Sequence, residues 1–107
     1  MLAGKDEVRG MTVDEIVVEA QLVTGTEKLR GRADVMIPLG PTGFIHLLGC
    51  SIVERQGRGP IVFLPSRRGQ KENQFFDCVR LLGPIRQLVT DAVLREFGRV
   101  KKAAGKT

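Results

Sequence analysis

Residues 44 to 65, FIHLLGCSIVERQGRGPIVFLP, contain two apolar runs joined by a short glycine-bearing stretch. The runs cover residues 44–54 and 60–65, and both carry apolar side chains at odd and even positions alike. The connecting RQGRG segment has two glycines, which suit the backbone of a tight hairpin turn. The pattern predicts two adjacent antiparallel strands whose apolar side chains emerge on both faces of a sheet.

The segments on either side extend this antiparallel pattern. Residues 13–23 and 28–38 alternate apolar with polar side chains, and glycine-containing turns follow each of them. One face of these two strands gathers the apolar side chains of Ile16, Val18, Ala20, Leu22, Leu29, Ala33, Val35 and Ile37. A fifth run, QFFDCVRLL, covers residues 74–82. The sequence therefore predicts a five-stranded antiparallel β-meander.

The last part of the chain changes to a helical period. Apolar side chains recur at spacings of three and four residues, at Ile85, Leu88, Val89, Ala92, Val93, Phe97 and Val100. Gly83 and Pro84 open this segment, with proline in the first turn, where a helix tolerates it. The helix is expected to end near Gly98 or to fray beyond it. The predicted fold class is thus α+β, a β-meander followed by a C-terminal amphipathic helix.

The chain has 107 residues, a length that fits one domain with one small core. We expect residues 13–100 to form that domain. Residues 1–12 are expected to be disordered, and residues 101–107 to form a basic C-terminal tail.

One helix can cover only one face of such a sheet, which leaves apolar side chains on the other face without cover. A second copy of the chain is the simplest cover, since two-fold homodimers are the commonest oligomers. The residues predicted to form the dimer interface are Ile45, Leu47, Val62, Leu64, Phe76 and Leu82.

The charge distribution points to a polyanionic partner. The net charge is +5, but the first 27 residues hold six acidic and two basic groups, and the remaining 80 hold six acidic and fifteen basic groups. A surface of that kind attracts nucleic acid first, and an anionic membrane or an acidic protein second. Aromatic residues make up only 5% of the chain, without Trp or Tyr, so base stacking is poorly provided for.

The sequence gives no sign of an enzyme, a cofactor or a metal site. His46 is the only histidine and has no evident catalytic partner, and Cys50 and Cys78 are widely spaced and are expected to be buried. No nucleophile elbow or phosphate-binding glycine loop is present. No segment is long and apolar enough to span a membrane, and the N-terminus lacks the apolar centre of a secretory signal. A cytoplasmic protein is expected.

Arg67 and Arg68 are the leading candidates for contact with an anion. Pro65 has no backbone N–H and interrupts the strand, so the chain should leave the sheet where the two guanidinium groups stand. Each guanidinium can grip a phosphate with paired N–H donors, and Lys71 follows in the next loop. Taken alone, the two arginines fit a solvated loop as well as an anion site.

The helix contributes a second set of cations. Arg95, Arg99 and Lys102 lie at i, i+4 and i+7 and form one stripe beside the apolar side chains. Cations near a helix C-terminus also compensate the helix dipole, which is the simpler explanation for these three. Glu96 lies inside the apolar arc, where it must reach either a partner at the dimer interface or water.

Four segments together resemble the stage V sporulation protein G (SpoVG) family of bacterial septation regulators. They are LRGRADVMIPLG from residue 29, IVE at residues 52–54, GPIVFLPSRR at residues 59–68 and AVLREF at residues 92–97. The third strand reads HLLGC where the family has a Val-Val-His-Asp-Ile run, so the chain resembles a divergent member. The resemblance implies a small dimeric protein with an antiparallel sheet and a C-terminal helix that binds DNA or RNA.

Two functions remain open from the sequence. The first is a homodimeric nucleic-acid-binding regulator that uses Arg67, Arg68 and Lys71 together with the helix cations. The second is an adaptor that modulates septum formation by binding other proteins, with its basic surface facing an acidic partner.

Overall fold

The computed structural model describes residues 15–24, 29–54, 57–72 and 74–105. Residues 1–12, for which disorder is expected from the sequence, lie outside these ranges. The elements are β1 (Val17–Leu22), β2 (Leu29–Pro38), β3 (Phe44–Glu54), β4 (Pro60–Phe63), β5 (Ser66–Arg68), β6 (Phe75–Asp77) and α2 (Pro84–Gly105). The predicted α+β class is confirmed. No helix in the described part of the chain is both long and apolar enough to cross a membrane.

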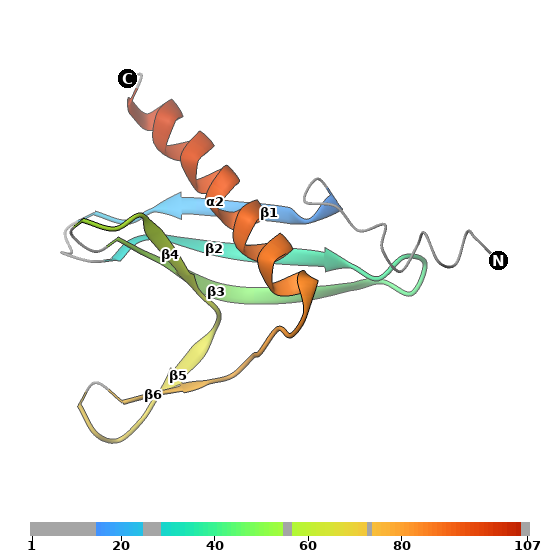
Figure 1. Ribbon diagram of the computed structural model, residues 1–107, viewed down its shortest axis with the longest axis horizontal. Helices are drawn as coiled ribbons and strands as arrows, with labels where there is room; N and C mark the ends of the chain where they lie inside the picture. Colours follow the sequence, from blue (N-terminus) through green and yellow to red (C-terminus); the bar gives the residue numbers. More distant parts are fainter. Residues whose placement is uncertain (1–14, 25–28, 55–56, 73, 106–107) are drawn as a thin grey trace.

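The first four strands form one antiparallel sheet in the order β1-β2-β3-β4 (Figure 1). The hairpin predicted from residues 44–65 is present, with Ile52 paired to Val62 and Glu54 paired to Pro60. Along β2 the side chains alternate strictly, and Ala33, Val35 and Ile37 all point into the core. Regular alternation on β2 is what the sequence predicted.

The predicted fifth strand is wrong in length and in position. Strand β6 covers only Phe75–Asp77, and it pairs with β5 in a separate two-stranded sheet that lies beside the main one (Figure 1). The chain leaves the main sheet at Leu64 because Pro65 lacks the N–H needed to continue the ladder. The carbonyl of Pro65 instead accepts a hydrogen bond of 3.1 Å from the amide of Cys78, at the base of the new hairpin.

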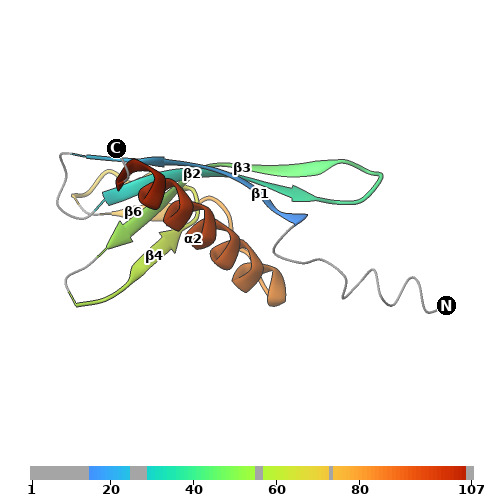
Figure 2. The same ribbon diagram turned by 90° about the horizontal axis from the view of Figure 1, so that it is seen from above.

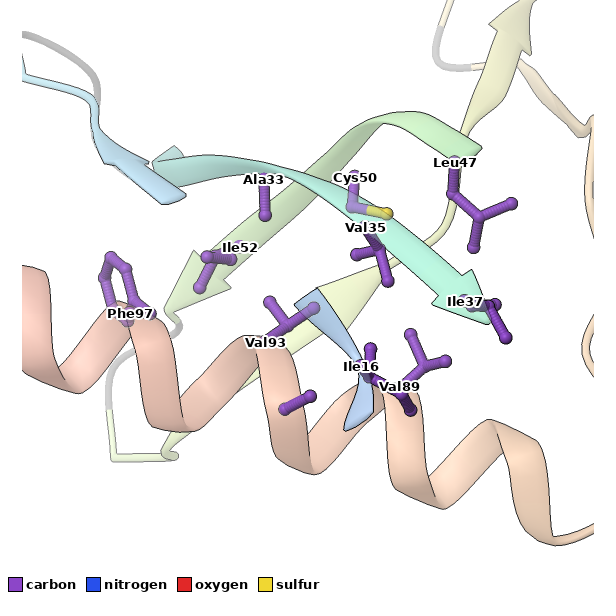
Figure 3. Close-up of a cluster of buried hydrophobic side chains, with 11 residues drawn as sticks. Ile16, Ala33, Val35, Ile37, Leu47, Cys50, Ile52, Val89, Val93 and Phe97 are labelled. Atoms are coloured by element: carbon purple, nitrogen blue, oxygen red, sulfur yellow. The ribbon is translucent and has the colours of Figure 1, made fainter. Parts of the chain in front are cut away.

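Helix α2 packs across one face of the four-stranded sheet (Figure 2). Its buried side chains, Val89, Ala92, Val93 and Phe97, lie against the inward side chains of β2 and β3 (Figure 3). The helix continues past Gly98 to Gly105, so most of the predicted basic tail is helical. Lys101 fixes this extension to the sheet through a 3.3 Å ion pair with Glu54 at the end of β3.

A bulge in β3 changes which side chains reach the core. Leu47 and Cys50 are both buried although they are three residues apart, because Val35 pairs with Leu47 while Ala33 pairs with Cys50. Gly49 takes a positive φ of 87° at this point, and its amide donates a 2.9 Å hydrogen bond to Oδ1 of Asp34. Odd-numbered residues of β3 therefore face the core before the bulge, and even-numbered residues face it after the bulge.

The face of the sheet opposite α2 is not covered by any described element (Figure 2). Strand register places Val17, Phe44 and Phe63 on this face, and all three are exposed. We call it the open face.

Candidate functional site

The β5–β6 hairpin carries two arginines and two phenylalanines in matched positions. Arg67 pairs with Phe76, and Arg68 pairs with Phe75. Because neighbouring residues of a strand point to opposite sides, each side of the hairpin presents one guanidinium and one aromatic ring. The hairpin lies apart from the helix-covered core (Figure 1).

Both rings of the hairpin are accessible to solvent. Phe75 is 63% exposed and Phe76 is 40% exposed. The guanidinium carbon of Arg67 lies 4.8 Å from the centroid of the Phe76 ring, which is within the range of a cation–π contact. This contact holds the cation and the ring together on one side of the hairpin.

The turn between β5 and β6 is held by its own hydrogen bonds. The amide of Gly69 donates to the carbonyl of Gln74 over 2.7 Å, and the amide of Gln74 donates to the carbonyl of Lys71 over 3.1 Å. The side chain of Gln74 folds into the turn, where its Oε1 accepts a 3.1 Å hydrogen bond from the amide of Lys71. A Cβ at Gly69 would lie 2.5 Å from that same Oε1, so a larger residue there would push the Gln74 side chain out of the turn.

The turn and the strand ends enclose an open hollow of about 360 Å³. Its lining is Arg67, Arg68, Gly69, Gln70, Lys71, Gln74 and Phe76. Arg67, Arg68 and Lys71 are all exposed, and none of them forms an ion pair with a carboxylate of the described residues. Three uncompensated cations around one hollow favour the binding of an anionic group.

The helix cations lie elsewhere. Arg95, Arg99 and Lys102 belong to the C-terminal half of α2, which lies at the opposite end of the molecule from the hairpin (Figure 1). The structure therefore does not bring the two predicted groups of cations together within one chain.

Arg99 is also engaged by an acid. Its Nε and Nη2 atoms donate hydrogen bonds of 2.9 and 2.5 Å to the two carboxylate oxygens of Glu96. The Arg99 guanidinium holds the pKa of Glu96 below its usual value, and Glu96 in turn raises the pKa of Arg99. Glu96 thus reaches a cation on its own helix, and Arg99 is partly neutralised for any outside anion.

The residues predicted for the dimer interface do not share one face. Leu47 is buried in the core under α2, and Ile45, paired with Ile37, points to the same side because both precede the β3 bulge. Val62 and Leu64 also pack against that core, since Val62 pairs with the buried Ile52.

The two remaining interface candidates lie outside the main sheet. Phe76 belongs to the hairpin, and Leu82, which is 82% exposed, lies in the segment that leads into α2.

Sequence reasoning missed Phe75 as a functional candidate. The sequence predicts the QFFDCVRLL run as a fifth strand of the main sheet, a position in which its rings would be buried. The signal against that assignment is Pro65, which follows β4 by two residues and has no backbone N–H to continue the ladder of the main sheet.

The other candidate side chains carry no site within the described ranges. His46 is exposed on β3 opposite Met36, and no cluster of three potential metal ligands forms there or elsewhere in the described chain. Cys50 is buried as predicted, and burial, assisted by the charge of Asp34, raises the pKa of its thiol to about 11. Cys78 is exposed, contrary to the prediction, because it lies at the base of the hairpin.

Comparison with known proteins found no matching family model, no matching curated protein and no matching solved structure.

Proposed function

We propose that this protein is a nucleic-acid-binding regulator that contacts phosphate groups through its β5–β6 hairpin. The observation that carries the proposal is the set of three exposed cations, Arg67, Arg68 and Lys71, around one open hollow without a carboxylate partner among the described residues. Arginine binds phosphate through two parallel N–H donors, and two adjacent arginines can hold two successive phosphates of a backbone.

The resemblance to the septation regulators supports the same hairpin. The segment GPIVFLPSRR, which is one of the four that carry the resemblance, ends in Ser66–Arg68, and these residues form β5, so this part of the resemblance coincides with the basic hollow. The proposed role is therefore that of a cytoplasmic regulator of the SpoVG type that acts on DNA or RNA.

We further propose that the protein acts as a homodimer joined through the open face. On this face Glu19 pairs with Asp34, and two acids in directly opposite positions repel each other. Arg32 lies two residues from Asp34 on the same side of β2, and the apolar Phe63 is nearby on the same face. In a two-fold dimer Arg32 of each copy can lie over the acidic pair of the other, which offsets the repulsion.

The test of nucleic-acid binding is a salt titration of fluorescent DNA and RNA. For duplex DNA the slope of log K against log salt is about 0.9 per phosphate contact, so the Arg67→Ala, Arg68→Ala variant should lose roughly two from that slope per site engaged. Affinity should fall about equally for unrelated sequences, because phosphate contacts do not read bases.

The matched control is the Arg58→Ala, Arg86→Ala variant. It removes two positive charges, as the hairpin variant does, but the two exposed arginines that it replaces lie neither in the hairpin nor on the open face. Its slope should change by much less. Equal slopes for the wild type and the hairpin variant, with both folded by circular dichroism, would reject the hairpin as the phosphate site.

A protein-binding adaptor is the second candidate. A hollow of about 380 Å³ lies between β4 and the segment before α2, lined by Ile61, Leu64, Val79 and Leu82 with Arg80 and Arg86 beside them. An apolar segment flanked by acidic residues would fit this lining. If the wild-type protein binds neither DNA nor RNA, the adaptor becomes the leading function.

A further inference from the structure

We infer that the β5–β6 hairpin binds single-stranded nucleic acid by stacking unpaired bases on Phe75 and Phe76; the inference rests on the proposed function. It assigns to the two rings a role that phosphate binding does not need. The ligand class is a single strand of DNA or RNA, bound through both its backbone and its bases.

The exposure of the rings is the first reason. A phenylalanine has no polar group to justify an exposed position, and burying one is strongly favourable. Phe75 and Phe76 are consecutive, both are exposed, and both lie on a short hairpin outside the core. The Phe75 ring is largely open on one side of the hairpin. On the other side the Arg67 guanidinium lies over part of the Phe76 ring, and the rest of that ring is open to solvent.

The position of the arginines is the second reason. Each ring lies directly across the hairpin from a guanidinium, Phe76 from Arg67 and Phe75 from Arg68. A nucleotide presents a flat base and a charged phosphate within one residue, so it requires an aromatic surface and a cation side by side. The hairpin provides that combination twice, and proteins that bind single strands without sequence preference use the same two components.

The geometry also discriminates against duplexes. In a double helix the bases are already stacked and paired, so a ring can reach one only after it has been extruded. The arginines can still contact the duplex backbone, and a two-stranded hairpin fits the major groove, but the phenylalanines gain no stacking there. Removing the rings should therefore weaken single-strand binding selectively.

The experiment compares oligonucleotides of about 16 nucleotides, oligo-dT and oligo-rU, with a duplex of the same length by fluorescence anisotropy. The Phe75→Leu, Phe76→Leu variant keeps apolar bulk in the hairpin but removes both aromatic faces. Its single-strand affinity should fall by about tenfold or more, and its duplex affinity should stay within about twofold. The salt slope should stay unchanged because the phosphate contacts remain.

Two further variants and a fluorescent oligonucleotide make the result specific. Leu39→Ala removes an apolar side chain that is 46% exposed in the turn between β2 and β3, outside both the hairpin and the open face, and it should leave binding unchanged. Phe75→Tyr with Phe76→Tyr keeps both aromatic faces and should retain the wild-type affinity. An oligonucleotide with 2-aminopurine should lose fluorescence when it binds the wild type and not when it binds the leucine variant.

The outcomes separate this inference from the proposed function. If the arginine variant loses affinity while the leucine variant binds single strands as the wild type does, the hairpin binds phosphate only and stacking is rejected. If the wild type binds neither single strands nor duplexes, the proposed function fails and stacking fails with it.

Discussion

At the scale of single residues, Cys50 shows how burial alone changes chemistry. The thiol is 0% exposed, and its pKa is about 11 instead of the ordinary 9.0, first through loss of hydration and second through the nearby charge of Asp34. The unfolded chain loses the Cys50 proton at lower pH than the folded chain does. Folding therefore becomes less favourable as pH rises from about 9 to about 11, and it is unaffected by this group below that window.

The direction of this pH dependence leads to a prediction for the two cysteines. Between neutral pH and about pH 11 the free energy of unfolding should fall by about 2 kcal/mol more in the wild type than in a Cys50→Ala variant. Urea titrations at both pH values measure the difference. Cys78→Ala should behave as the wild type does, because the Cys78 thiol is exposed. An equal pH dependence in all three proteins would contradict the buried position of Cys50.

Other assignments at this scale were predictable only in part. The inward positions of Ala33, Val35 and Ile37 follow from alternation on β2, and the structure confirms them. The inward position of Leu47 does not follow from alternation, since it depends on the bulge at Gly49. A glycine inside a strand is a signal for a bulge, but it does not show on which side of it the register changes.

At the scale of the elements, the sequence predicts the helix and the first four strands of the expected five-stranded meander, because the apolar patterns of these segments are clear. It does not predict the hairpin, because β5 and β6 have three residues each, which is too short for a period to be recognised. Arg67, Arg68 and Lys71 follow the end of β4 in the sequence, and the structure has all three around one hollow; that they bind an anion stays a prediction. Their neighbouring rings could not be predicted, since the pairing of Arg67 with Phe76 depends on the turn geometry.

Replacement of glycine by alanine should have opposite effects on stability at the bulge and in the helix. Gly49→Ala should destabilise the protein by about 1–2 kcal/mol, because φ at Gly49 is 87° and a Cβ is strained there. Gly98→Ala should stabilise it by about 0.5–1 kcal/mol, since Gly98 lies inside α2 and a Cβ there meets no atom within 4 Å. Thermal or urea unfolding measures both changes. A stabilising Gly49→Ala would contradict the bulge.

At the scale of the whole molecule, the open face makes the proposed dimer testable by charge reversal. Arg32→Glu would place a negative charge over the partner's Glu19 and Asp34, and the dimer dissociation constant should rise by about tenfold or more. Adding Glu19→Arg to the same chain should restore association, because the charges are then exchanged. Light scattering across a concentration series measures the mass, and hence the dimer dissociation constant, of both variants.

Arg58→Glu serves as the control for this experiment, because it makes the same change of charge in the turn between β3 and β4. Its dissociation constant should match that of the wild type. A wild-type protein that is monomeric at micromolar concentration would reject the dimer, and an unchanged mass for Arg32→Glu would reject the open face as its interface.

The separation of the β5–β6 hairpin from the main sheet has a consequence for its motion and its evolution. A two-stranded ribbon is only marginally stable by itself, so its amides should exchange with solvent through local opening that leaves α2 and its sheet folded. A ligand that binds the hairpin must then hold both of its strands in place, and the cost of ordering them lowers the net free energy of binding. The same independence means that substitutions from Ser66 to Asp77 can alter what the protein recognises without disturbing the core that keeps it folded.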